Sequence, residues 1–200
     1  TLELLVKVYN EIAPHFNCRK VDINDVQHLR GKRPQDMLHD YKVTVAKLPL
    51  LVTWGRFKMN NKMNEIQFFE SMLSVLKKMK SLGLSLGILT SNSQKNIQGF
   101  IQRYKLDDLF DYVYTGKHIF GKAELLRKIM KEHRIDHQNI LYVGDETRDI
   151  EAAKKADIKM AAVCWGFNNK EALMKLNPDY IVEQPHTLLN IVQNNSIAST

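Results

Sequence analysis

The sequence predicts an α/β fold, a mostly parallel sheet with helices on both faces, together with a small helical unit at the start of the chain. From residue 65 onward, short apolar runs alternate with segments in which apolar residues recur every three to four positions. Strands that alternate with helices are typical of a parallel sheet. Before residue 64 the helical spacing continues, and no convincing strand interrupts it.

Length and composition suit one domain, with or without a smaller insert. The chain has 200 residues, 44% hydrophobic and 26% charged, which excludes a disordered tail, a collagen-like repeat and a disulfide scaffold. No apolar run reaches the roughly 20 residues that span a bilayer, and no signal peptide is recognised, so no membrane partner is expected. Cys18 and Cys164 lie far apart in no metal-binding pattern, which favours reduced thiols in a cytoplasmic protein.

The net charge of +7 is concentrated near the start of the chain. Residues 1–64 hold 11 Lys and Arg against 6 Asp and Glu, whereas residues 65–200 hold 18 against 16. A basic region can meet nucleic acid or a small anionic substrate, and a solvated surface is the alternative for any single cation. Interleaved aromatic residues, a recognition motif and a basic stripe are lacking, so no nucleic-acid partner is expected.

The elements are justified in chain order by apolar spacing. Helices are expected at 1–13, 24–28 and 34–43, and the polar, basic stretch 56–62 is interpreted as a linker. Later helices are expected at 65–82, 93–104, 122–133, 148–155, 170–175 and 187–193. Ser93 is the expected N-cap of the second of these. Strands are expected at 84–90, 111–115, 139–143, 159–164 and 179–182. The resulting division is a helical unit over 1–63, an α/β core over 64–194 and a tail over 195–200.

Two of the predicted strand ends offer groups for an anion. Thr90, Ser91 and Asn92 follow the strand 84–90, and a hydroxyl followed by backbone N–H groups near a helix start suits a phosphate. Turn and cap residues are the alternative explanation. Lys122 opens a helix, where the dipole disfavours a cation unless it faces an anion, and an ordinary surface lysine is the alternative.

A third strand end carries two carboxylates. Asp145 follows the strand 139–143, and Asp149 lies four residues on at a helix start, where the dipole favours a negative charge. Two carboxylates placed close together repel each other unless a cation lies between them. Hard oxygen ligands suit Mg²⁺, which also accepts phosphate oxygens as ligands. The alternative is an N-cap aspartate beside a surface aspartate.

The segment 84–182 resembles the haloacid dehalogenase-like hydrolases, in particular members similar to phosphoglycolate phosphatase. LGILTSNS resembles their second motif, with Thr90 as the phosphate-binding hydroxyl, and Lys122 resembles the lysine of the third, which balances the charge of nucleophile and phosphate. GDETRDIEAAKKAD resembles the fourth motif, which implies that Asp145 binds Mg²⁺ and that Asp149 supports the metal and its waters. The resemblance implies a Rossmann-like core and a helical cap domain.

Within the helical unit, LRGKRPQDML resembles the stretch of the cap in which this family places a glycine and side chains that touch substrate. Arg30, Lys32 and Arg33 are therefore candidates to contact the distal anionic group of a substrate. Ordinary surface charges are the alternative for each. The cap of this family closes over the site to exclude water.

The sequence departs from the family at its first motif. Family members begin with a central strand ending in Asp-x-Asp, whose first aspartate takes the phosphoryl group and whose second is the general acid and base. The remaining aspartate pairs follow no strand: Asp22 and Asp25, Asp36 and Asp40, Asp107 and Asp108. We expect the nucleophile to lie upstream of residue 1, which would leave this chain inactive and two neighbouring strands with unpaired edges. A non-catalytic relative is the alternative.

The resemblance thus implies a Mg²⁺-dependent phosphatase that hydrolyses a small phosphomonoester through an aspartyl-phosphate. A helical cap leaves little room for a macromolecule, so the expected partner is a small phosphorylated metabolite. A phosphomutase relative that uses the same residues and a non-catalytic binding or regulatory module are the alternatives.

Overall fold

A computed structural model of the protein describes residues 2–32, 34–62, 65–67, 69–115 and 121–197. The first helices are α1 (Leu2–Ile12), α2 (Val26–Leu29), α3 (Pro34–Asp40) and α4 (Leu48–Asn61). The later helices are α5 (Glu70–Ser81), α6 (Gln94–Tyr104), α7 (Lys122–His133), α8 (Thr147–Ala156), α9 (Lys170–Met174) and α10 (Thr187–Ile197). The strands are β1 (Gly87–Thr90), β2 (Tyr112–Thr115), β3 (Leu141–Gly144), β4 (Lys159–Val163) and β5 (Tyr180–Val182).

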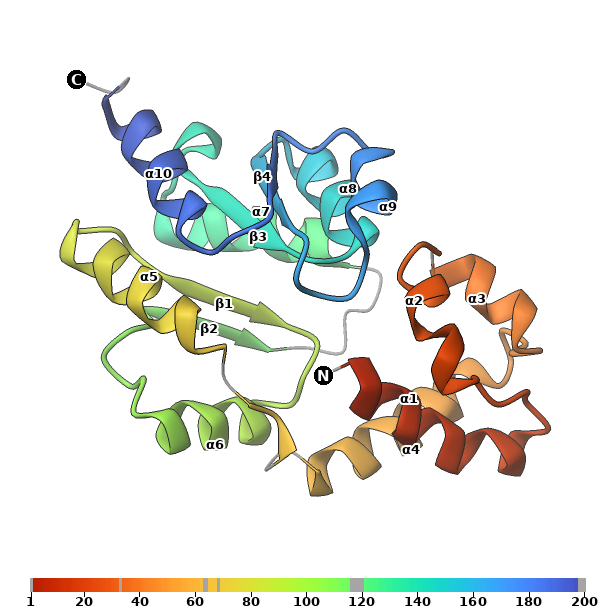
Figure 1. Ribbon diagram of the computed structural model, residues 1–200. Coiled ribbons are helices and arrows are strands. Elements are labelled where there is room, and N and C mark those ends of the chain that lie inside the picture. Colours follow the sequence, from red (N-terminus) through yellow and green to blue (C-terminus); the bar gives the residue numbers. More distant parts are fainter. Residues whose placement is uncertain (1, 33, 63–64, 68, 116–120, 198–200) are drawn as a thin grey trace.

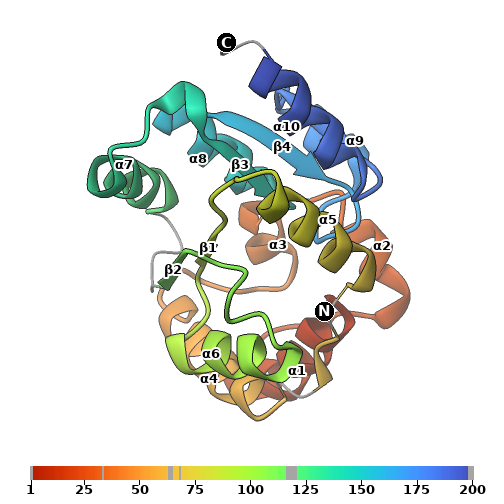
Figure 2. The same cartoon turned by 90° about the vertical axis from the view of Figure 1, so that its left-hand side faces the viewer.

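Within the part of the chain that the structure describes, all five strands pair in parallel, which confirms the predicted α/β class, but they form two sheets. One sheet has the order β2-β1 and the other the order β3-β4-β5. Figures 1 and 2 show β1 and β3 as the strands of the two sheets that lie nearest each other. Within the described residues no strand pairs with the remaining edge of β1 or of β3, so the expected single sheet is divided at this point.

The strand β4 organises the core because both of its faces are buried. Met160 and Ala162 pack with residues of α7, α8 and α9 on one face. Ala161 and Val163 pack with residues of α5 and α10 on the other face. Strand residues alternate between the faces of a sheet, so a continuous apolar run is the expected pattern where helices cover both. The layered arrangement of helices and strands is visible in Figure 2.

The N-terminal helices have apolar clusters of their own. One cluster joins α1 to α2 and the segment before it, through Val6, Val21, Val26 and Leu29. A second joins the end of α1 to α4, through Ile12, Ala13, Cys18 and Leu51. Figure 1 shows these helices on the side of the molecule toward which β1 and β3 point. The division at residue 63 stays a prediction.

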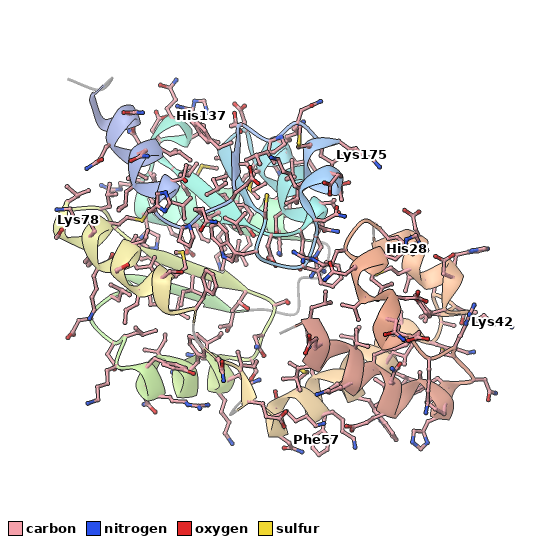
Figure 3. All side chains as sticks on the ribbon, in the orientation of Figure 1. His28, Lys42, Phe57, Lys78, His137 and Lys175 are labelled. Atoms are coloured by element: carbon pink, nitrogen blue, oxygen red, sulfur yellow. The ribbon has the colours of Figure 1, made fainter. Side chains whose placement is uncertain are left out.

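The structure corrects the prediction of a linker at 56–62, because α4 extends to Asn61. Its start is marked by Pro49 in the first turn, a position that tolerates a residue without an N–H. The pattern was hard to recognise because the apolar residues of α4 do not form one stripe: Leu51 is buried whereas Phe57 is 66% exposed. Figure 3 shows Phe57 at the lower rim of the molecule.

Smaller corrections concern the ends of elements. The strand expected at 84–90 begins only at Gly87, and the helix expected at 65–82 begins at Glu70. The predicted tail overlaps α10, which continues to Ile197. Among the residues that the structure describes, no helix is both long enough and apolar enough to cross a membrane.

Candidate functional site

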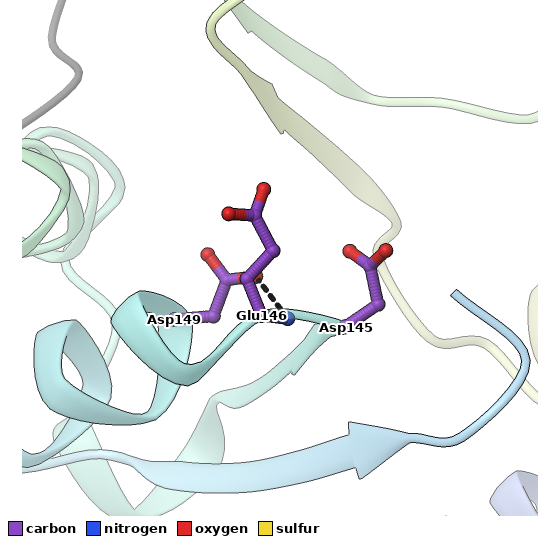
Figure 4. Close-up of side chains that lie close together, drawn as sticks. All are labelled: Asp145, Glu146 and Asp149. Carbon is purple, nitrogen blue, oxygen red and sulfur yellow. Dashed lines mark hydrogen bonds between the residues drawn. The ribbon is translucent and has the colours of Figure 1, made fainter. Parts of the chain in front are cut away.

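The acidic cluster lies in the turn from β3 into α8. Carboxylate oxygens of Asp145, Glu146 and Asp149 lie within 4.8 Å of one another. Figure 4 shows the three side chains rising from the same side of the turn. The sequence predicted the two aspartates as a pair, and the structure adds Glu146 as a third carboxylate.

Asp149 is the most enclosed member of the cluster and accepts from three donors. The ammonium of Lys122 and the hydroxyl of Tyr142 both reach Oδ1, the latter at 3.0 Å. The backbone N–H of Glu146 donates to Oδ2 at 3.1 Å, drawn as the dashed line in Figure 4. Lys122 therefore faces an anion at the start of α7, the arrangement that the helix dipole requires for a cation at that position.

The local backbone explains why Asp149 lies so close to the strand. Glu146 and Asp149 form a reciprocal capping box at the N-terminus of α8, in which each side chain accepts from the backbone N–H of the other. Gly144 leaves the space that the side chain of Asp149 fills, since a Cβ there would lie 2.6 Å from Oδ2. A glycine before the acidic turn is thus a packing requirement of the site.

Asp145 is held from the opposite side by the loop after β4. Its Oδ2 accepts a hydrogen bond of 2.6 Å from the backbone N–H of Phe167. Gly166 permits this approach, because a Cβ on that residue would overlap the side chain of Asp145. Oδ1 of Asp145 accepts no hydrogen bond from the described residues, which leaves it available to a ligand.

Burial changes the acid–base behaviour of two neighbouring side chains. Burial, and then the charge of Asp149, raise the pKa of Tyr142, so the phenol keeps its proton and acts as a donor. Burial also raises the pKa of Glu146, and Arg148, which donates to its carboxylate at 2.6 Å, opposes that shift. Arg148 thus compensates the charge of Glu146, as Lys122 compensates that of Asp149.

The predicted phosphate-binding segment follows β1 in the other sheet. Thr90, Ser91 and Asn92 are all half-buried. The hydroxyl of Thr90 accepts from the backbone N–H of Asn92 at 3.1 Å. Ser93 caps α6 by accepting from the N–H of Asn96 at 3.3 Å, as its position after a strand predicted. The segment is therefore an ordered turn that leads into a helix N-terminus.

Asn96 links this turn to the helical unit. Its amide is buried and donates to Oδ1 of Asn92 at 2.8 Å and to Oδ1 of Asn60 at the end of α4. Hydrogen bonds of Thr90, Asn92 and Asn96 connect residues of this turn and reach α4. The structure thus joins Lys122 to the acidic cluster directly and holds Thr90 in a separate loop.

The three cap candidates differ in their surroundings. Arg30 donates to backbone carbonyls of the loop after β4, at 3.0 Å to Cys164 and 3.1 Å to Gly166. Lys32 forms an ion pair with Asp40 of α3. Arg33 lies outside the described residues. A substrate contact for Arg30 and Lys32 stays a prediction. The contacts of Arg30 join the helical unit to the loop after β4.

The donor set of the acidic cluster fits a hard divalent cation. Three carboxylates offer oxygens within 4.8 Å of one another, and no described residue donates to Oδ1 of Asp145. Mg²⁺ is bound in proteins by one or two carboxylates, with waters and phosphate oxygens as its other ligands. Asp145 is the residue best placed to hold it, because Arg148 engages both oxygens of Glu146 and Lys122 engages Asp149.

Sequence comparison decides the family. The sequence model of the haloacid dehalogenase-like hydrolases matches residues 1–163. The chain belongs to this family. A phosphoglycolate phosphatase of Synechococcus elongatus is 32% identical over 192 residues, which cover 96% of this chain and 91% of that protein. Pyrophosphatase PpaX of Bacillus mycoides is 24% identical over 196 residues, covering 96% and 90%.

The fold of the haloacid dehalogenase-like hydrolases is also found by structural comparison. The crystal structure of a predicted phosphatase from Clostridium acetobutylicum superposes with a TM-score of 0.80 at 20% identity, covering 96% of this chain and 91% of that one. The Rossmann-like core with a helical cap, which the sequence motifs implied, is therefore confirmed as the fold of this chain.

Sequence reasoning missed the residues of this haloacid dehalogenase-like hydrolase that lie around the acidic turn. Tyr142 was assigned only to a strand, and Glu146 only to a motif. Asn168 and the loop after β4 were not considered, although polar residues after a strand are the places to search in a parallel sheet. The same rule, applied to the end of β4, identifies the loop that contains Asn168 as a candidate part of the site.

Proposed function

We propose that the protein is a Mg²⁺-dependent phosphatase that hydrolyses a small phosphomonoester in the cytoplasm. The observation that carries this proposal is the contact of Lys122 with Asp149, next to Asp145, to whose Oδ1 no described residue donates. A cation beside carboxylates that could bind a metal supports the proposal, because the transfer of a phosphoryl group requires both. The cytoplasmic assignment is supported by the two cysteines, Cys18 and Cys164, which are not joined to each other.

Mg²⁺ would be held by Asp145, with Asp149 supporting the metal and its waters, and when bound it supplies positive charge that neutralises the phosphate oxygens. The ammonium of Lys122 adds charge on the same side, and Asp149 and Tyr142 fix its position through Asp149 Oδ1. A group held in place before the substrate arrives needs no reorganisation during the reaction.

The turn after β1 would bind the phosphate from the other side. Thr90 offers a hydroxyl, and the turn 91–92 offers backbone N–H groups next to the N-terminus of α6. A phosphoglycolate phosphatase is among the relatives, and the first 64 residues carry most of the net positive charge. The substrate we propose is accordingly a small phosphorylated carboxylate. The proposal includes no nucleic acid and no membrane as a partner of the protein.

The attacking group in this proposal is an aspartate outside the 200 residues. Its carboxylate oxygen would bond to phosphorus as the ester oxygen leaves with a proton from a second acid, and water would then hydrolyse the aspartyl-phosphate. A strand that paired with the open edges of β1 and β3 would end between Thr90 and Asp145, where such an aspartate is needed.

The test is release of inorganic phosphate from phosphoglycolate and from an aryl phosphate, with and without Mg²⁺. The 200-residue chain is compared with a chain extended upstream that contains an Asp-x-Asp motif. We expect only the extended chain to be active, and we expect Asp145→Asn in it to abolish activity while Asp107→Asn, an exposed control, does not. An inactive extended chain would favour the non-catalytic module, and transfer of phosphate between sugar hydroxyls would favour the phosphomutase.

A further inference from the structure

The loop between β4 and α9, residues 164–169, is bonded on one side to the helical cap and on the other to the acidic turn. We propose that Asn168 is a positioning residue that, together with Arg30, couples the placement of the cap to the orientation of Asp145. The inference rests on the proposed function only in treating Asp145 as a cation ligand. The bonds themselves are independent of that assignment.

Asn168 is fully buried, with no exposed surface, and its side-chain amide connects both sides. Its Oδ1 accepts from the backbone N–H of Thr147, the first residue of α8, at 3.0 Å. Its Nδ2 donates to the backbone carbonyls of Arg30 at 2.9 Å and Lys32 at 3.1 Å. A buried amide with all of these partners is costly to disturb, because any separation leaves polar groups unpaired.

Arg30 reinforces the cap side of this junction through its guanidinium. Nε donates to the carbonyl of Phe167 at 3.3 Å, and one terminal nitrogen donates to the carbonyls of Cys164 and Gly166. In the reverse direction, the carbonyl of Arg30 accepts from the N–H of Asn169 at 2.9 Å. The planar guanidinium thus holds the backbone of the loop through several hydrogen bonds, and its role is not only to supply charge.

On the other side, the same loop holds Asp145 at two points. The backbone N–H of Phe167 donates to its carboxylate at 2.6 Å, and the N–H of Asn168 donates to its carbonyl at 3.0 Å. Displacement of the loop therefore changes both the main chain and the carboxylate of Asp145. Since Arg30 bonds to the carbonyls of Gly166 and Phe167, a shift of the cap reaches this carboxylate across one peptide unit.

Two variants separate the cap side from the core side. Arg30→Met keeps an unbranched apolar stem and the carbonyl that Asn168 uses, but removes the guanidinium donors. Asn168→Asp keeps an acceptor for Thr147 and removes the donors to the cap. The matched controls are Arg19→Met and Asn190→Asp, the same changes at exposed positions.

The first readout is hydrogen exchange of individual backbone amides in the full chain. We expect Arg30→Met to speed exchange at Phe167 and Thr147 by roughly tenfold, as the loss of buried charge-assisted bonds predicts. The amide of Leu126, in the core on α7, should exchange at the wild-type rate. Unchanged exchange at Phe167 and Thr147 in Arg30→Met would overturn the proposal, and that variant decides the matter if Asn168→Asp fails to fold.

The second readout is the affinity for Mg²⁺ measured by titration calorimetry. We expect roughly tenfold weaker binding in Arg30→Met, typical of changes to groups that orient a ligand. The double variant should lose little more than either single variant, because both interrupt the same connection. Wild-type affinity in a folded Arg30→Met protein would reduce its role to stability and refute the coupling.

The two proposals fail in different ways. If the chain extended upstream binds no Mg²⁺, the proposed function is contradicted, while the exchange rates at Phe167 and Thr147 still decide whether the cap and the acidic turn are coupled. If Mg²⁺ binds with the same affinity in every variant, the metal site stands and the coupling is wrong.

Discussion

The hydroxyl of Tyr142 offers a sharp test of how the buried Asp149 is stabilised. The change Tyr142→Phe removes one oxygen and leaves the packing of the ring in place. The hydroxyl donates to Asp149 Oδ1 at 3.0 Å, and its raised pKa keeps the proton in place throughout the neutral range. The side chain of Asp149 is almost fully buried, so water cannot substitute for the lost donor.

The magnitude follows from the charge of the acceptor. Hydrogen bonds to charged groups contribute about 1.5–3 kcal/mol, and bonds between neutral groups about 0.5–1.5 kcal/mol. Asp149 keeps Lys122 and the N–H of Glu146 as donors, so we expect a loss near the lower limit, about 1.5 kcal/mol. For a chain of this length the melting temperature should fall by roughly 3–6 °C.

The control for Tyr142→Phe is Tyr104→Phe, the same chemical change at a hydroxyl that donates to the neutral carbonyl of Ile66 at 3.1 Å. Urea unfolding at 25 °C, followed by circular dichroism, gives the free energy of unfolding for both variants. Tyr142→Phe should lose more stability than Tyr104→Phe. An equal or smaller loss would refute the idea that the phenol stabilises a buried carboxylate.

Three further predictions use the same measurement. Gly166→Ala should lower the free energy of unfolding by about 1–3 kcal/mol, because the added Cβ overlaps the carboxylate of Asp145. Gly99→Ala in α6 should raise it, because no atom lies within 4 Å of the added Cβ and alanine favours a helix. Equal effects of the two changes would contradict this prediction. The ion pair with Lys80 lowers the pKa of Asp111 in the folded state. Its contribution to stability is therefore present above the unfolded-state pKa of about 4 and is lost as the pH falls through the lower folded-state pKa. Asp111→Asn should make the free energy of unfolding less dependent on pH in this range, and an unchanged pH profile argues against the prediction. Leu173→Ala should cost about 2–5 kcal/mol because the side chain is fully buried between helix and sheet, and a loss below 1 kcal/mol would show that the core collapses around it.

Much of the fold could be predicted because its signals are local. The β4 segment is apolar on both faces, which by itself requires helices on both sides. The start of α6 follows from Ser93, whose hydroxyl caps the helix as expected. The helix α4 could not be predicted in the same way, because Phe57 is exposed and so breaks the apolar pattern of the buried side that faces α1.

The site was predictable only in part, for a physical reason. Lys122, Asp145 and Asp149 each follow or open an element, and strand ends of a parallel sheet converge at one edge. Asn168 lies two residues past a glycine in an irregular loop, and two of its partners, the carbonyls of Arg30 and Lys32, are more than a hundred residues away. Every residue type has a backbone carbonyl, so a hydrogen bond to one cannot be predicted from the sequence at that position.

The edges of β1 and β3 that no described strand covers carry a risk during folding. Their eight residues, GILT and LYVG, include no charge and no proline, the features by which proteins usually protect an exposed strand edge from other chains. Val143 is 39% exposed in the middle of β3. The positions that would receive a neighbouring strand would equally receive a strand from another molecule, so the timing of strand pairing decides between a closed sheet and an aggregate.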